Sequence, residues 1–174
     1  MPRRASRCAR PILCLAALLF AGRVTAVAAQ RPDGRTMARM TAASAAYVVS
    51  ALLGARQSIR DTLTEAPFGH RSGRDARGDF LRTGTALSPG VPMLATQIFA
   101  TGLAYQPGAL GRDGARLLAL HGALYFGGQL VEPVTYRTMS NLGTAPRARV
   151  IQIVANVAIP ALLVAESIHA SRRY

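Results

Sequence analysis

The sequence has no lysine, no tryptophan and few acidic residues. All 21 of its basic residues are arginines, and they stand against eight acids. Its only cysteines, Cys8 and Cys14, lie near the N-terminus, so the sequence supports neither a disulfide framework nor a zinc site. It also lacks a glycine-rich phosphate loop, a zincin motif and a G-x-S-x-G motif. We therefore expect no enzymatic activity and no cofactor.

The sequence is rich in apolar residues and in arginine. Half of the residues are hydrophobic and 17% are charged, against a usual share of about 25%. A net charge of +13 would suit a nucleic-acid partner if it were gathered on one face or in a tail. The arginines are instead dispersed between long uncharged stretches, which is typical of residues that flank membrane spans. We expect the lipid bilayer, and no nucleic acid, to be the partner.

Residues 1–29 have the parts of a secretory signal peptide. Four arginines are followed by an apolar run and then by the small residues Ala26 to Ala29. Arg23, close to the expected cleavage site, is atypical. An uncleaved anchor and an organelle transit peptide are the alternatives.

Residues 30–174 are predicted to form an all-α polytopic transmembrane bundle of four helices. We expect these helices at about 38–56, 88–110, 115–136 and 149–169, with a flexible basic loop at about 57–87. Several uncharged stretches are shorter than the roughly 20 residues that a bilayer requires, but flanking arginines can extend to the headgroups. A soluble bundle is the alternative. Its helices should carry a charged outer face, which these stretches lack.

The arginine count near the spans predicts an orientation. With a cytoplasmic N-terminus, the inner side carries 13 arginines and the outer side seven, leaving out Arg23. The long basic loop is then cytoplasmic and the C-terminus lies outside. We expect the protein to be integral to a membrane, the bacterial plasma membrane being the favoured one.

A polar stripe follows the third predicted helix. Its residues are spaced four, four, three and four apart and fall within about 80° of arc: His121, Tyr125, Gln129, Glu132 and Tyr136. Polar groups are costly in contact with lipid, so this stripe should face the bundle interior. Gly122, Ala123, Gly127 and Gly128 give the same helix a small-residue packing face.

Polar residues on neighbouring helices can meet the stripe. From helix depth in an antiparallel arrangement, we predict an outer His121–Glu166 pair and an inner amide cluster of Gln97, Gln129 and Asn156. Pro160 should free the backbone carbonyl of Asn156.

Three functions are compatible with this pattern. The favoured one is a small integral membrane protein whose stripe packs its own helices or assembles with a membrane partner or a second copy. The first alternative is a carrier or proton-coupled protein that binds a polar ligand or ion through His121, Glu132 and Glu166. The second is a haem- or quinone-linked redox subunit using His121 and His169.

Overall fold

The computed structural model describes residues 31–63 and 76–174. The predicted leader and residues 64–75 of the predicted loop lie outside them. The described chain is mostly helical and forms six helices and one two-stranded hairpin. Four longer helices are α2 (Gly34–Arg60), α4 (Val91–Ala104), α5 (Gly108–Val131) and α7 (Arg147–Ser171). The short ones are α3 (Ala76–Arg82) and α6 (Pro133–Met139), and the hairpin pairs β1 (Gly84–Thr85) with β2 (Ser88–Pro89).

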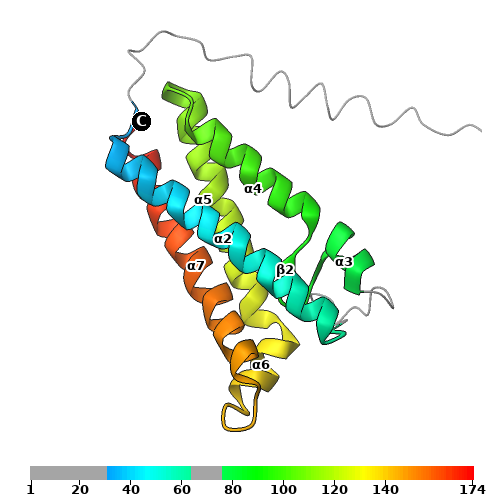
Figure 1. The fold of residues 1–174 in the computed structure, drawn as a ribbon. Coiled ribbons are helices and arrows are strands. Elements are labelled where there is room, and N and C mark those ends of the chain that lie inside the picture. Colours follow the sequence, from blue (N-terminus) through cyan, green and yellow to red (C-terminus); the bar gives the residue numbers. More distant parts are fainter. Residues whose placement is uncertain (1–30, 64–75) are drawn as a thin grey trace, which may run out of the picture.

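The longer helices alternate in direction along the bundle (Figure 1). α7 packs against both α5 and α2, and α4 packs against α5. One end of the bundle holds the start of α2, the α4–α5 turn and the C-terminus; we call it the terminal end. The opposite end holds α6 and the start of α7; we call it the α6 end.

Three predicted helix boundaries are wrong, and all three lie close to Pro107 or Pro133. The predicted helix 88–110 is shorter, because α4 ends at Ala104 and Pro107 disfavours helical geometry in the residue before it. The predicted helix 115–136 starts earlier, at Gly108, and ends at Val131. Glu132 is extended (ψ 127°) ahead of Pro133, which starts α6.

The region predicted as a loop, 57–87, also contains regular structure. α2 continues to Arg60, and α3 and the first hairpin strand follow residues 64–75. Gly84, the first residue of β1, has a φ of +105°, which other residues rarely adopt. Residues Gly84 to Gly90 are all buried, and α4 starts from them partway along the bundle (Figure 1).

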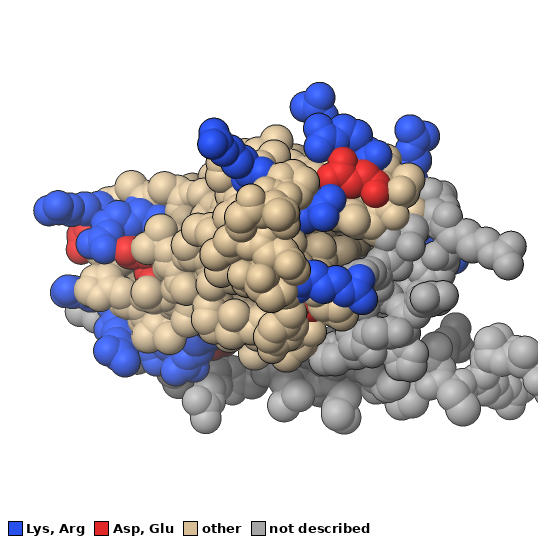
Figure 2. All heavy atoms as spheres, turned by 90° about the horizontal axis from the view of Figure 1, so that it is seen from below, with Lys and Arg blue, Asp and Glu red and all other residues tan. Residues whose placement is uncertain are grey.

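The surface between the two ends is largely apolar. Large hydrophobic side chains are at least half exposed on all four longer helices, among them Leu53, Phe99, Leu124 and Ile151. Seen from below in Figure 2, arginine side chains project at several places, mostly around the margin of a largely uncharged surface. α2 and α7 are long and apolar enough to cross a membrane, whereas α4 is apolar but has 14 residues.

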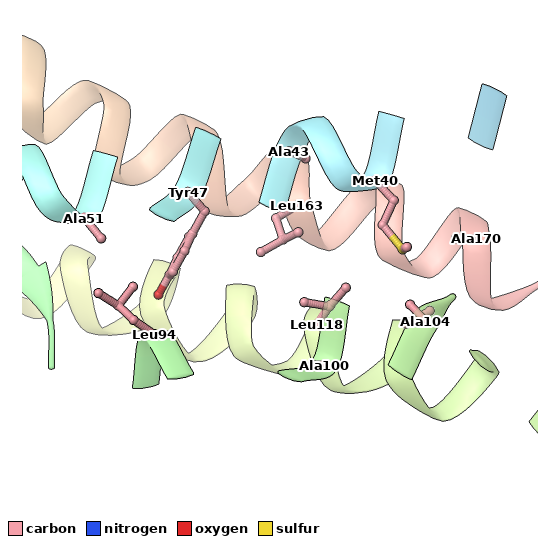
Figure 3. Close-up of a cluster of buried hydrophobic side chains, with 11 residues drawn as sticks. Met40, Ala43, Tyr47, Ala51, Leu94, Ala100, Ala104, Leu118, Leu163 and Ala170 are labelled. Atoms are coloured by element: carbon pink, nitrogen blue, oxygen red, sulfur yellow. The ribbon is translucent and has the colours of Figure 1, made fainter. Parts of the chain in front are cut away.

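The apolar core is built mainly from small residues (Figure 3). α2 contributes Met40, Ala43, Tyr47 and Ala51, which meet Leu94 and Ala100 of α4, Leu118 of α5 and Leu163 of α7. Small side chains let the helix backbones approach closely. At Gly122, for example, an added Cβ would lie 3.0 Å from the carbonyl oxygen of Pro160. The core therefore combines close backbone packing with a few large buried side chains, such as Tyr47, Met40 and Leu118.

Candidate functional site

A cluster of buried polar side chains joins α2, α5 and α7. Asn156 of α7 donates from Nδ2 to Gln129 Oε1 of α5 at 3.1 Å. Its Oδ1 accepts from Gln152 Nε2 at 2.8 Å and from Ser50 Oγ of α2 at 3.1 Å. The four side chains are each no more than 8% exposed. We call Ser50, Gln129, Gln152 and Asn156 the amide cluster.

The tip of the β1–β2 hairpin docks on this cluster. The backbone carbonyl of Leu87 accepts from Asn156 Nδ2 at 2.9 Å and from the Tyr125 hydroxyl at 3.3 Å. Gly54 of α2 lies against the same carbonyl so closely that a Cβ at this position would collide with it. Gly54 is six residues before the end of α2, so the tip lies about 9 Å inside the bundle. Non-helical backbone is thus held at depth by side chains of α5 and α7 and by close packing against the backbone of α2 at Gly54.

The cluster overlaps the prediction in part. Gln129 and Asn156 meet as expected, but Gln97 does not join them. Its Nε2 donates to Ser44 Oγ at 3.1 Å, and Ser44 hydrogen-bonds Thr101 at 2.7 Å. Ser44 is six residues from Ser50 along α2, about 9 Å nearer the terminal end. Gln97 therefore belongs to a separate polar contact between α2 and α4.

The predicted His121–Glu166 pair is not formed. Glu166 of α7 forms an ion pair with Arg39 of α2, with Nη2 and Oε1 2.6 Å apart. His121 instead packs edge-on against Tyr47, the ring centroids being 6.2 Å apart. An arginine on the adjacent helix offers the carboxylate a permanent, charge-assisted partner, which a neutral imidazole does not. His169, the other histidine of the redox hypothesis, is exposed on α7.

The polar stripe of α5 is shorter than predicted. His121, Gln129 and Glu132 are buried and Tyr125 is half-buried, but Tyr136 lies in α6 and is 62% exposed. The break at Pro133 turns the chain, so the period that places Tyr136 on the stripe no longer applies. Gly127 and Gly128 do not pack against a helix, since an added Cβ would meet nothing within 4 Å.

A cavity of about 540 Å³ lies beside the hairpin. Its walls come from the hairpin, from Met93 of α4 and from the second half of α5. Three residues of the predicted stripe, Tyr125, Gln129 and Glu132, take part in these walls. The stripe therefore borders both the amide cluster and an open space.

The polar residues that the sequence analysis did not identify lie mainly on α2. Ser44, Tyr47, Ser50, Gly54 and Ser58 are spaced three, three, four and four residues apart, and all are buried. That helical period was readable in the sequence as a second polar and small-residue face. The Leu87 carbonyl had no side-chain signal at all, because it is a backbone group.

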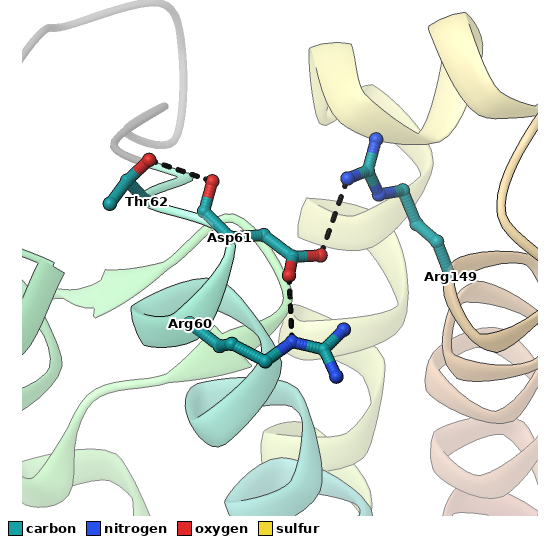
Figure 4. Close-up of polar contacts among 4 residues, drawn as sticks. All are labelled: Arg60, Asp61, Thr62 and Arg149. Atoms are coloured by element: carbon teal, nitrogen blue, oxygen red, sulfur yellow. Dashed lines mark hydrogen bonds and ion pairs between the residues drawn. The ribbon is translucent and has the colours of Figure 1, made fainter.

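Charged groups tie α2 to α7 at the α6 end (Figure 4). Asp61, just after α2, lies between Arg60 and Arg149: Oδ1 is 2.9 Å from Arg60 Nε and Oδ2 is 3.3 Å from Arg149 Nη2. The hydrogen bond from Arg60, together with that from Arg149, lowers the pKa of the Asp61 carboxyl. The carboxylate therefore stays ionised at neutral pH and links the two helix ends.

In the part of the chain that the structure describes, no group of three or more His, Cys, Asp or Glu side chains could hold a metal ion. No protein-family model, curated protein or solved structure matches the chain.

Proposed function

We propose that the protein is an integral membrane protein that crosses the bilayer four times, and that its interior polar residues lock its helices together. The observation that carries this proposal is that many polar side chains are buried beside the apolar core while large apolar side chains are exposed on the sides of the bundle. Gln97, Ser58 and Ser167 are fully buried, and Asn156 is 1% exposed, whereas Phe99 and Ile151 are 63% and 69% exposed. In water, such a surface would leave a large apolar area hydrated. In lipid, the same arrangement is favourable.

The lengths of the helices are compatible with a bilayer. α2 and α7 span about 40 Å and 37 Å, more than the roughly 30 Å of a hydrocarbon core. α4 spans only about 21 Å. The buried hairpin precedes it and would occupy the remaining depth as a re-entrant segment. Irregular backbone is tolerated at membrane depth only where protein or a cavity surrounds it, and here Asn156 and Tyr125 satisfy the Leu87 carbonyl.

The same contacts favour a packing role for the polar stripe over a carrier role. Each side chain of the amide cluster bonds to another helix or to the hairpin, so the cluster behaves as a connection between elements. Glu166, which the carrier hypothesis pairs with His121, is engaged by Arg39. We therefore assign the protein a structural or assembly role in the membrane.

Site-specific cysteine labelling tests the topology. Asp113→Cys lies near the terminal end and Asn141→Cys near the α6 end, and both positions are exposed. In a Cys8→Ser/Cys14→Ser background, a membrane-impermeant maleimide should label them from opposite sides of sealed vesicles. The α6 end, which carries Arg60 and Arg149, should face the cytoplasm. Ser44→Cys, buried in the bundle, should resist labelling. Labelling of both exposed positions from one side would contradict four spans.

A further inference from the structure

The cavity beside the hairpin is apolar over most of its wall and meets the apolar surface of the bundle. Leu124 and Val131 line it and are also 61% and 48% exposed. Gly127 and Gly128 form another part of the wall, and the missing side chains leave the space open. Its volume of about 540 Å³ falls in the range of small-molecule sites. An apolar molecule in the bilayer could enter it sideways.

One part of the wall is polar. Thr85 is 8% exposed, and its Oγ1 has no hydrogen-bond partner among the described residues. Gln129 and Glu132, at 4% and 5% exposure, line the same space. A buried hydroxyl without a partner is costly, and a ligand group that bonds to it would remove that cost. The wall thus combines a long apolar surface with a short polar segment.

The charge of the wall selects against one class of amphiphile. None of the described residues that line the cavity is basic, so its wall offers no counterion to an anionic head group in a low-dielectric site. A fatty-acid anion is therefore disfavoured. An uncharged head with hydroxyl groups can both donate to and accept from Thr85.

We propose that this cavity binds an uncharged single-chain lipid of the monoacylglycerol type. Its acyl chain lies along Leu124, Gly127 and Val131, and its hydroxyl head bonds to Thr85 Oγ1. The inference rests on the proposed membrane location, since the bilayer supplies the ligand. It is distinct from the packing role of the amide cluster, because Gln129 is the only member of the cluster that lines the cavity.

Photolabelling of the full chain in phosphatidylcholine vesicles tests the inference. The probe is a monoacylglycerol with a diazirine in its acyl chain. Trypsin should release the cavity walls in two peptides, 83–112 and 117–137, and lipid-facing α7 residues in the peptide 150–172. We expect all three peptides to be labelled. Excess unlabelled monoacylglycerol should remove the label from the first two peptides but not from the third. An equal excess of fatty acid at neutral pH should leave all three unchanged.

Two pairs of variants locate the site. Gly127→Leu fills the cavity and should abolish the competable labelling, whereas Gly102→Leu is the matched control, because Gly102 also has open space around it but lies outside the cavity. Thr85→Val should weaken competition about three- to tenfold by removing one hydrogen bond, and Thr85→Ser should restore it.

The results separate this inference from the topology. If the chain inserts into vesicles but labelling is uniform, is displaced equally by fatty acid, or survives Gly127→Leu, the lipid site is overturned and the membrane protein stands. If the chain does not insert at all, both proposals fail.

Discussion

Replacing Asn156 tests whether the interior polar residues hold the bundle together. Asn156→Leu keeps a side chain of similar size and removes four hydrogen bonds, to Leu87, Gln129, Gln152 and Ser50. Polar contacts between membrane helices contribute on average about 0.6 kcal/mol each, so the variant should lose about 2.4 kcal/mol of unfolding free energy. The hairpin should also loosen, because its tip carbonyl would keep only the weaker bond from Tyr125.

The measurement is the unfolding free energy in mixed micelles, from helicity followed by circular dichroism during titration with a denaturing detergent. Asn141→Leu is the matched control. Asn141 is exposed, and its side chain donates to Arg137 and Ser140 within its own turn, so this variant should change stability by less than about 0.5 kcal/mol. If Asn156→Leu is as stable as the Asn141→Leu control, the cluster does not stabilise the bundle and the reasoning is refuted.

Two further predictions concern the α2–hairpin contact and the charged end of α2. Gly54→Ala should destabilise the protein by about 2 kcal/mol or more in the same titration, because its Cβ would collide with the Leu87 carbonyl. The control Gly127→Ala lies in open space and should leave stability unchanged or raise it. Equal effects of the two variants would contradict the contact between Gly54 and Leu87. Asp61→Asn should cost stability at pH 7. The Asp61 pKa is lowered chiefly by Arg60, so its contribution is complete above the unfolded-state pKa of about 3.9 and is lost as pH falls through the lower folded-state value. The difference between wild type and Asp61→Asn should therefore shrink below pH 4, and a difference constant down to pH 2 would exclude this role.

Helical periodicity and antiparallel depth were sufficient to place Gln129 near Asn156. Both residues lie on long helices, and their depths follow from the rise per residue, so the sequence predicts a contact that the structure has at 3.1 Å. Helix depth alone could not decide which of two nearby groups binds the Glu166 carboxylate. Glu166 and His121 have compatible depths, but Arg39 on α2 is a stronger counterion and takes the carboxylate.

The hairpin shows what side-chain patterns leave out. The sequence predicts a loop up to residue 87 and a helix from residue 88, because no side-chain pattern in the uncharged stretch Thr83 to Pro89 indicates a buried hairpin. Its position depends on a backbone carbonyl, on a positive φ at Gly84 and on the absence of a Cβ at Gly54. Gly84 and the Pro89-Gly90 pair were turn signals within that stretch. The distant side chains that bury the turn could be known only from the fold.

The most direct test of the account is whether the protein stays in the membrane when peripheral proteins are removed. Membranes from cells that express the full chain are washed with alkaline carbonate and sedimented by ultracentrifugation. Because large apolar side chains are exposed on the sides of the bundle, we expect the protein to remain in the pellet and to enter the supernatant only with detergent. Folded, helical protein in the supernatant without detergent would contradict the central claim.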